Sequence, residues 1–514
     1  MKNRSRTEYS LINISTGLLG YALNTILGFI CRIVFVQTLA VDYLGVNGLF
    51  TNILSMLSLA ELGISSAIIY ALYKPISTDD KGKIASIMQF YRKVYSVIGC
   101  IVAIIGFALL PFLNLIIKEP PQIQESIYLL YLLYLLNTAI SYFFSYRSSL
   151  LIAMQRQYIV SGYNYIVTIL QSVLQVAFLI ATHNYLIYLL IQTVGGISYN
   201  IWLSWKAAKD YPYIKNRDAE PLSKEEKHSL FWNIKALAVN KLSGVLVNST
   251  DNIAITYFSG IGSVGLTSNY ILLSNTLGGV LGQVFNALPG SVGNLNASSS
   301  SEERYRFFNV LNLTNFWLFG WAAIGIMFVS SDLVQLLFGE NYVLPMRIPM
   351  IIAINSYTIG MLQAVYTYKS TMGLFKYGQY LLIFTGIINL VMDVYMGDLY
   401  GMFGIYLATL VARICTNLWY EPYAVYRYGL KKSPLIYFRR YLKFAFVLVV
   451  TGIICFYLCR VCHFSILINV LLKVAICSIV PNLIFLLAFY KTEEFQYLKK
   501  KLGLIFSHLI LRAK

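Results

Sequence analysis

Apolar runs of about 20 residues recur along the whole chain, and they limit its possible folds more than any other feature. Hydrophobic residues make up 58% of the 514 residues, and charged residues make up 12%. A soluble protein of this length needs more polar residues to cover its core. In a bilayer, a run this long must satisfy its backbone polar groups internally, which a helix does. The sequence therefore predicts an all-α polytopic membrane protein.

Basic residues set the predicted topology, because Lys and Arg accumulate in cytoplasmic loops. The net charge is +18, and with a cytoplasmic N-terminus only Lys118, Arg347 and Arg460 fall in predicted outer segments. We therefore expect both termini in the cytoplasm, and we expect no nucleic-acid partner despite the charge. The fourteen predicted transmembrane helices are residues 11–39, 44–72, 90–117, 127–153, 158–181, 184–205, 230–258, 264–290, 307–329, 346–368, 378–396, 401–424, 441–459 and 466–490.

Two pairs of similar motifs indicate an internal repeat. "SYRSS" (145–149) resembles "TYKST" (367–371) at an offset of 222, and "GVNGLF" (45–50) aligns with "GLTSNY" (265–270) at an offset of 220. Six spans separate the copies, and six is an even number. The sequence therefore predicts two parallel six-helix repeats with the substrate path between them.

The predicted domain organisation follows from this repeat. The domains are an N-terminal six-helix bundle (1–205), a cytoplasmic linker loop (206–229), a C-terminal six-helix bundle (230–426), two extra transmembrane helices (427–490) and a basic tail (491–514). The tail is predicted to form an amphipathic helix on the inner membrane surface. Its apolar residues recur at helical spacing and are Phe495, Leu498, Leu502, Ile505 and Leu509.

Arg32 lies inside the first predicted span, where an isolated positive charge costs roughly 2.5–3.5 kcal/mol. It continues a stripe of small or polar residues at every fourth position, which are Gly20, Asn24 and Gly28. The repeat aligns Arg32 with the seventh span, in which Asp251 lies equally far from the outer end. Three roles stay open: an outer gate formed with Asp251, a contact to an anionic substrate, or a side chain that reaches the outer headgroups.

Further charged and polar residues inside the spans complete the predicted site. We predict a cationic substrate-binding cavity formed by Arg32, Arg147, Lys241, Lys369 and Arg413. The predicted polar lining is Asn24, Asn248 and Asn252, and the predicted gate or ion-coupling residues are Arg32, Asp251 and Glu61. An excess of embedded cations favours a phosphate-bearing anionic cargo. Basic flanking of a helix end is the simpler interpretation of Lys369, and a structural hydrogen bond explains Arg413 equally well.

No sequence motif indicates catalysis or a bound cofactor. The chain has no Walker A motif and no Ser/His/Asp arrangement, and its four histidines leave little for metal chemistry. We therefore expect neither an enzyme nor a cofactor, and the driving force could be Na⁺, H⁺ or the membrane potential. "CRVCH" (459–463) fits the c-type haem attachment pattern, but a short loop between helices offers no domain to enclose a haem.

Four stretches resemble the polysaccharide transporters of the multidrug/oligosaccharidyl-lipid/polysaccharide exporter superfamily, that is, Wzx-like lipid-linked oligosaccharide flippases. These stretches are "YLGVNGLFTNILSMLSLAELGISSAIIYALYKPI" (43–76), "VNSTDNIAITYFSGIGSVGLTSNYILL" (247–273), "ALPGSVGNLNA" (287–297) and "NLWYEPYAVYRYG" (417–429). The stretch "KYGQYLLIF" (376–384) departs from the more charged, Pro-containing version expected in the family.

The resemblance implies two six-helix bundles in a V shape with two further C-terminal helices. It also implies alternating access in the bacterial cytoplasmic membrane, which moves undecaprenyl-pyrophosphate-linked oligosaccharide to the outer leaflet for capsule, exopolysaccharide or O-antigen assembly. Implied partners are membrane lipids, this lipid-linked substrate and the polysaccharide polymerase machinery. Two alternatives are a cation-coupled multidrug exporter of the same fold and a membrane polysaccharide polymerase or ligase.

Overall fold

The structure is a computed structural model that describes residues 6–58, 64–215, 220–228, 230–231, 250–286, 288–374, 376–378 and 380–501. Within these residues the regular secondary structure is helical throughout. Eleven of the described helices are long and apolar enough to cross a membrane. The prediction of an all-α multi-pass membrane protein is therefore confirmed.

Contacts divide the chain into two compact units, Met1–Gly265 (unit 1) and Leu266–Lys514 (unit 2). The finer domain limits predicted above remain predictions. The helices of unit 1 are α1 (Arg6–Thr38), α2 (Val41–Leu57), α3 (Ile64–Ser77), α4 (Lys81–Leu109), α5 (Leu113–Ile116), α6 (Ile127–Ala153), α7 (Gln157–Thr182), α8 (Tyr185–Asp210), α10 (Asp251–Ser259) and the start of α11 (Ile261–Asn286). The span predicted at 127–153 coincides with α6.

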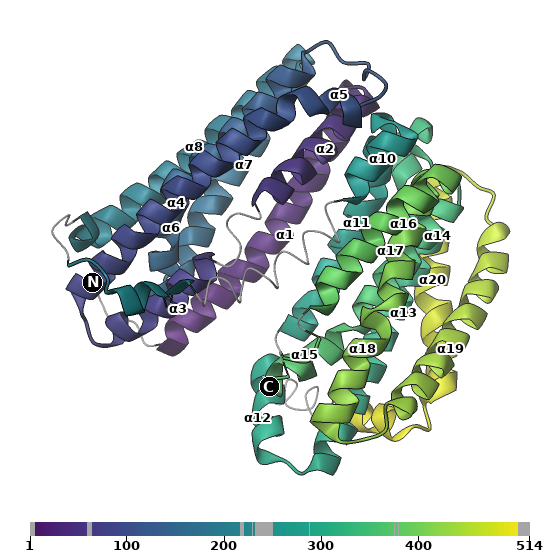
Figure 1. The fold of residues 1–514 in the computed structure, drawn as a ribbon. Coiled ribbons are helices and arrows are strands. Elements are labelled where there is room, and N and C mark those ends of the chain that lie inside the picture. The colour runs from purple at the N-terminus through teal and green to yellow at the C-terminus, as the bar shows by residue number, and fades with distance from the viewer. Residues whose placement is uncertain are drawn as a thin grey trace, which may run out of the picture. The chain divides into compact units, whose positions relative to one another are not determined.

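Helix α6 is central in unit 1, where it packs against α4 and α8, while α1 lies along α7 (Figure 1). Buried tyrosines connect these helices. The Tyr134 and Tyr185 hydroxyls are 2.9 Å apart and share a hydrogen bond. Tyr131 donates a hydrogen bond to the Gly106 carbonyl oxygen at 3.1 Å. Each of these buried hydroxyls has a partner, so the tyrosine rings can fill the core without leaving a polar atom unsatisfied.

Glycines allow α2 to approach α10 and the start of α11 inside unit 1. A Cβ atom on Gly45 would lie 2.1 Å from the Ile261 carbonyl oxygen, and one on Gly265 would lie 2.4 Å from the Val41 carbonyl oxygen. Both distances are too short for any side chain, and both obstacles are backbone atoms. The two glycines that begin the aligned motifs "GVNGLF" and "GLTSNY" are therefore both required by close helix packing.

In unit 2 the long helix α13 packs against α14, α15, α19 and α20. The Phe316 ring of α13 stacks on Phe444 of α19, with centroids 4.5 Å apart, and also contacts Phe485 of α20. The helices of this unit after α11 are α12 (Pro289–Ser298), α13 (Ser301–Phe338), α14 (Arg347–Met361), α15 (Gln363–Thr371), α16 (Leu381–Tyr400), α17 (Met402–Cys415), α18 (Asn417–Ala424), the π-helix η5 (Val425–Leu430), α19 (Pro434–Arg460) and α20 (Ile466–Phe489).

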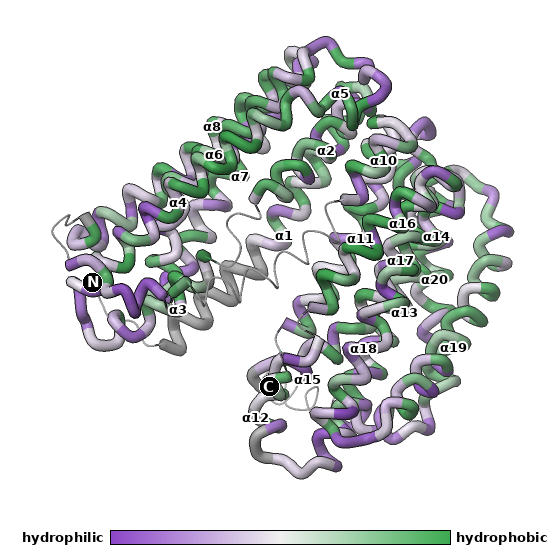
Figure 2. The backbone as a smooth tube through the Cα atoms, in the orientation of Figure 1, coloured by the Kyte–Doolittle hydropathy of each residue, from purple (hydrophilic) through white to green (hydrophobic). Residues whose placement is uncertain are grey.

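The long helices are rich in hydrophobic residues, which Figure 2 shows by the green colour along the backbone, and many of these residues are exposed. Phe446 of α19 is 70% exposed and Leu487 of α20 is 72% exposed. Large apolar side chains exposed along helices of this length suit contact with lipid. The chain is a multi-pass membrane protein.

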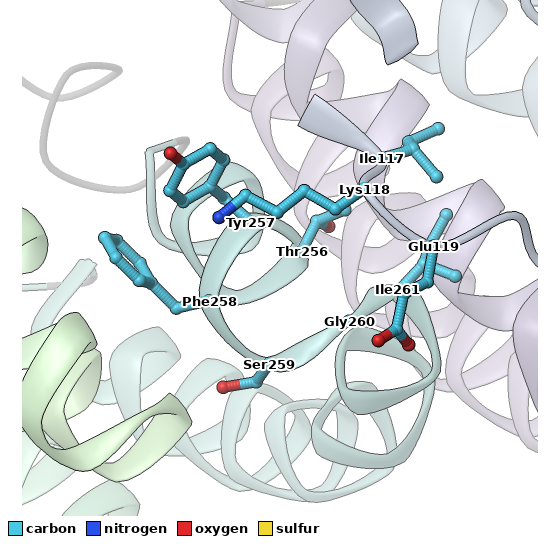
Figure 3. Close-up of a pocket in the computed structure, with 9 residues that line it drawn as sticks. All are labelled: Ile117, Lys118, Glu119, Thr256, Tyr257, Phe258, Ser259, Gly260 and Ile261. Atoms are coloured by element: carbon cyan, nitrogen blue, oxygen red, sulfur yellow. The ribbon is translucent and has the colours of Figure 1, made fainter. Parts of the chain in front are cut away.

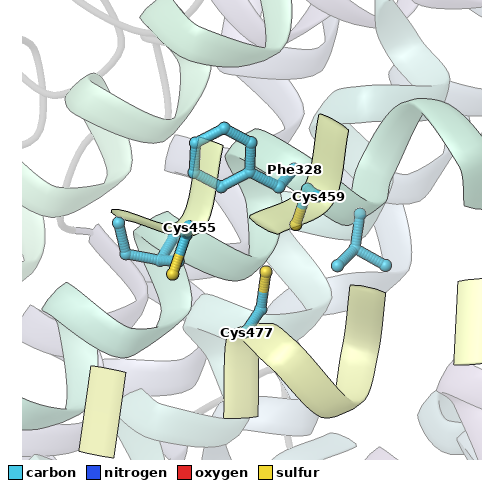
Figure 4. Packing of buried hydrophobic residues seen from close by; sticks show 6 residues of the cluster. Phe328, Cys455, Cys459 and Cys477 are labelled. Carbon is cyan, nitrogen blue, oxygen red and sulfur yellow. The ribbon is translucent and has the colours of Figure 1, made fainter. Parts of the chain in front are cut away.

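Three cysteines lie together in the core between α13, α19 and α20. Cys455, Cys459 and Cys477 are buried, and they pack beside Phe328 with their sulfur atoms turned toward one another (Figure 4). All seven cysteines of the chain are free thiols. Cys459, the first residue of "CRVCH", is therefore part of helix packing.

Two predicted spans are interrupted in unit 2. The span predicted at 346–368 is divided into α14 and α15 at Leu362, and the span predicted at 401–424 is divided into α17 and α18 at Thr416. Thr416 donates a hydrogen bond to the Ala412 carbonyl oxygen at 2.6 Å, four residues earlier. Such side-chain bonds to the preceding turn bend helices, and an apolar run does not reveal them.

The described start of the predicted tail packs on α13. Residues 493–501 are helical, and Phe495 stacks on Trp317 with ring centroids 5.7 Å apart. Tyr497 makes an edge contact with Phe307, and Arg440 pairs with Glu494 at 2.8 Å. Leu502, Ile505 and Leu509 lie outside the described residues. The membrane-surface position of the tail remains a prediction.

Candidate functional site

Arg147 is the predicted cavity residue that the structure leaves with neutral partners. It lies on α6, half-buried, where its Nη1 donates to the Ser204 hydroxyl of α8 at 2.7 Å. Its Nε donates to the Tyr146 hydroxyl at 3.0 Å. Its Nη1 also donates weakly to the Ser204 carbonyl oxygen at 3.5 Å, and no carboxylate among the described residues pairs with it. A guanidinium held by hydroxyls keeps its positive charge available to an anion.

Arg32 lies on α1 near the start of α8. Its neighbour Cys31 donates to the Ser172 carbonyl oxygen of α7 at 3.9 Å, and Phe35, one turn later, makes an edge contact with Tyr188 of α8. Arg32 is close enough to Tyr188 to interact with it electrostatically. The structure therefore places this arginine beside α8 in unit 1, and the three predicted roles remain predictions.

Lys369 has a buried counter-charge. Its Nζ donates to both carboxylate oxygens of Glu421, at 2.9 and 2.6 Å. The Glu421 side chain is 2% exposed and that of Lys369 is 13% exposed. This pair ties α15 to α18. Glu421 lies in the motif "NLWYEPYAVYRYG", 52 residues from Lys369, and no spacing in the sequence marks the two as partners.

Arg413 of α17 is directed to α14. Its Nη1 donates to Asn355 Oδ1 at 3.1 Å, and Asn355 Nδ2 in turn donates to the Tyr406 carbonyl oxygen at 2.8 Å. The side chain is 9% exposed. This geometry agrees with the structural interpretation of Arg413, since the bonds join two packed helices.

The structure shows a buried polar stripe on α16 that the predicted site did not include. Thr385, Asn389 and Asp393 recur at every fourth position and are at most 1% exposed. Thr385 bonds to the Thr416 hydroxyl at 2.8 Å, and Asn389 Nδ2 donates to Asp393 Oδ2 at 2.7 Å. The signal that could have found the stripe is its four-residue spacing inside an apolar span. A buried carboxylate beside amide and hydroxyl groups can bind a proton or a small cation.

The other predicted residues have structural surroundings that leave their roles open. Asp251 is the first residue of α10, and a negative side chain at this position stabilises the N-terminus of a helix. Asn252 Nδ2 donates weakly to the Gly48 carbonyl oxygen at 3.5 Å. Asn24 Oδ1 is buried and accepts no hydrogen bond from the described residues. Lys241, Asn248 and Glu61 lie outside the described residues.

A pocket of about 350 Å³ lies in unit 1 where the loop after α5 meets the end of α10 (Figure 3). Lys118 extends over the Tyr257 ring, with Nζ 3.5 Å from the ring centroid. Glu119 and Ser259 also line the pocket. Its size and polar groups suit a small polar molecule. No group of three or more His, Cys, Asp or Glu side chains in the described part of the chain could hold a metal ion.

The fold is similar to that of known membrane transporters. A structure described as "Lipid II flippase MurJ, inward closed conformation" matches with a TM-score of 0.61 and 14% identity, over 93% of this chain and 99% of that one. An inward-facing multidrug resistance MATE family transporter of the MOP superfamily matches with a TM-score of 0.57 and 16% identity, over 82% and 98% of the two chains. An outward-facing MATE transporter of the same superfamily matches with a TM-score of 0.51 and 14% identity, over 82% and 96%.

The chain therefore shares its fold with these solved membrane proteins. No protein-family model matches the sequence, and no curated protein matches it. Identities of 14 to 16% establish the fold, whereas the substrate requires separate argument.

Proposed function

We propose that this protein is a flippase that moves undecaprenyl-pyrophosphate-linked oligosaccharide from the inner to the outer leaflet of the bacterial cytoplasmic membrane, for capsule, exopolysaccharide or O-antigen assembly. The observation that carries the proposal is Arg147, a guanidinium inside a candidate span whose partners among the described residues are neutral oxygen atoms. A pyrophosphate is the anionic group that such a cation binds well. The fold similarity to a lipid II flippase supports the same substrate class.

The remaining predicted residues extend this proposal. Arg32 and Asp251 form an outer gate, and Glu61 and Asp251 are the candidates for coupling to Na⁺, H⁺ or the membrane potential. Exchange of the two gate charges tests the gate. If Arg32→Asp combined with Asp251→Arg restores no more transport than either single variant, the two residues do not form a pair. The polysaccharide polymerase machinery is the proposed downstream partner.

A reconstitution experiment tests the flippase function. Full-length protein is placed in vesicles containing a fluorescent undecaprenyl-pyrophosphate sugar, and an impermeant quencher reports the lipid that reaches the other leaflet. We expect transport by the wild type, partial transport by Arg147→Lys and little by Arg147→Ala. If the wild type moves no more lipid than empty vesicles under Na⁺, H⁺ and potential gradients, the proposal is wrong.

A cation-coupled multidrug exporter is the second candidate, because MATE transporters share the fold. Because the partners of Arg147 are neutral, its positive charge is not compensated. That charge repels a cationic drug, which argues against this second function. Deletion of the gene separates the two functions. A flippase deletion is expected to accumulate undecaprenyl-linked repeat units on the cytoplasmic leaflet, whereas an exporter deletion is expected to raise drug sensitivity.

A further inference from the structure

Four tyrosines of unit 2 form a cluster of contacting rings, here called the tyrosine platform, which consists of Tyr377, Tyr420, Tyr423 and Tyr428. Tyr377 stacks on Tyr428 with ring centroids 3.9 Å apart and planes 7° from parallel. Tyr423 makes an edge contact with Tyr428 and lies 6.0 Å from Tyr420. The platform joins the loop between α15 and α16 to α18 and η5. Tyr428 is 40% exposed, so the aromatic cluster is open to a ligand.

An unusual backbone holds the platform in place. Tyr428 lies in the π-helix η5, and the next residue after η5, Lys431, has a left-handed φ of 54°. π-helical turns are rare and occur frequently at functional sites, and a left-handed backbone is strained for a lysine. Opposite η5, a Cβ on Gly378 would lie 2.8 Å from the Tyr420 ring, and Gly378 has a φ of 76°. Glycine is therefore required where Tyr420 covers the loop.

Basic residues surround the tyrosine platform. The segments 363–381 and 416–432 contain five basic residues and one acidic residue, Glu421. Glu421 is paired with Lys369, whose Nζ lies 3.6 Å from the Cβ position of Gly378. Lys376 Nζ lies 5.1 Å from the Tyr377 ring centroid, and Arg427 is exposed. Lys432 pairs with Glu302 at 2.8 Å, so Lys376, Arg427 and Lys431 are the basic residues that give this surface its positive charge.

A ring of interfacial aromatic anchors is the simpler interpretation, because Tyr, Trp, Lys and Arg gather at membrane surfaces. Such anchors act singly and do not need to contact one another. Here four rings from two segments touch, and a strained backbone maintains the contact. These observations favour recognition of a ligand over simple anchoring.

We infer that the tyrosine platform, with Arg427 and Lys376, binds the sugar and pyrophosphate headgroup of the lipid-linked substrate before transport. The inference rests on the flippase function proposed above. Apolar faces of a sugar ring pack on the exposed tyrosine rings, and the basic side chains bind the pyrophosphate. The distribution of Lys and Arg predicts that this end of unit 2 faces the cytoplasm, where the substrate is made.

Binding in lipid nanodiscs tests the platform. Full-length protein in phosphatidylcholine nanodiscs is titrated with undecaprenyl-pyrophosphate N-acetylglucosamine and, separately, with sugar-free undecaprenyl pyrophosphate. We expect Tyr428→Ala to weaken binding of the sugar-bearing lipid about tenfold and that of the sugar-free lipid much less. Tyr428→Phe, which keeps the ring, should bind as the wild type does. Arg427→Ala should weaken the binding of both lipids.

Matched controls make the result decisive. Tyr395 of α16 is 63% exposed, and Arg439 of α19 is exposed; neither belongs to the platform. Tyr395→Ala and Arg439→Ala should bind both lipids like the wild type, and thermal unfolding confirms that all variants are folded. A Tyr428→Ala variant that binds like the wild type overturns the inference and leaves the flippase function intact. If Tyr428→Ala weakens the binding of both lipids equally, and does so in phosphatidylglycerol nanodiscs as well, the inference is also wrong, because Tyr428 then acts as a membrane anchor. A wild type that binds neither lipid shows instead that the proposed function is wrong.

Discussion

Arg147 in unit 1 and Lys369 in unit 2 are aligned by the internal repeat that the sequence predicts, but their partners differ. Arg147 is held by the hydroxyls of Ser204 and Tyr146, whereas Lys369 is neutralised by the buried carboxylate of Glu421. A neutralised lysine contributes to the packing of α15 on α18. A cation with neutral partners retains charge for a ligand. Equivalent positions in a repeat can therefore have different physical tasks.

The largest expected effect on stability comes from Glu421→Gln. This change leaves the Lys369 ammonium without its buried counter-charge, so we expect a loss of about 3–5 kcal/mol in the free energy of unfolding. Thermal unfolding of the purified protein measures it. The double variant Lys369→Met with Glu421→Leu should recover most of the loss. A single variant as stable as the wild type would show that the pair contributes nothing to unit 2.

Arg147→Met should show the opposite pattern. Its partners are neutral hydroxyls, so we expect a stability loss of about 1 kcal/mol and a fall in substrate affinity of about 10- to 100-fold. Unfolding and lipid-binding titrations on the same preparation separate the two quantities. If Arg147→Met lowers the free energy of unfolding as much as Glu421→Gln does, the proposed difference between Arg147 and Lys369 is wrong.

Close helix packing can be compared in the two units through one glycine in each. A Cβ on Gly45 would lie 2.1 Å from the Ile261 carbonyl oxygen, and one on Gly404 would lie 1.9 Å from the Met396 carbonyl oxygen. Gly45→Ala and Gly404→Ala should each cost about 1–3 kcal/mol, because the helices must move apart. Gly28→Ala is the matched control, since open space surrounds that position. It should unfold at or slightly above the wild-type temperature.

The smallest effects are expected from two ion pairs at the ends of candidate spans, one in each unit, in which Glu226 and Lys432 lie outside the spans. The hydrogen bond from Lys83 lowers the pKa of the Glu226 carboxyl, and the hydrogen bond to Glu302 raises the pKa of the Lys432 ammonium. The Glu226 contribution is therefore present above its ordinary pKa of 4.5 and is lost as pH falls through the lowered value. The Lys432 contribution is present below its ordinary pKa of 10.5 and is lost as pH rises through the raised value.

Unfolding temperature measured against pH checks both signs. Glu226→Gln should remove a small part of the acid-side slope, below about 1 kcal/mol because the pair is exposed. Lys432→Met should flatten the curve of unfolding temperature against pH on its alkaline side only. Reversal of the two sides would contradict the assignment.

Much of the fold could be predicted from residue type and spacing. The length of each apolar run located α6 at residues 127–153, and the motif "GVNGLF" marked a glycine that close packing requires. The positions of Arg147, Lys369 and Arg413 inside or beside spans were also readable. Partners were not. Glu421 is 52 residues from Lys369, and Ser204 is 57 residues from Arg147.

The sequence by itself determined the class of this protein, a multi-pass helical membrane protein, because a bilayer accepts long apolar runs only as helices. The tertiary structure decided which embedded charges are neutralised, that α17 ends at Cys415 and which tyrosines meet in the platform. Run length is a property of neighbouring residues and can be read along the chain. Charge pairing and ring stacking depend on the rotation and crossing of helices, which the packing of many distant side chains decides together.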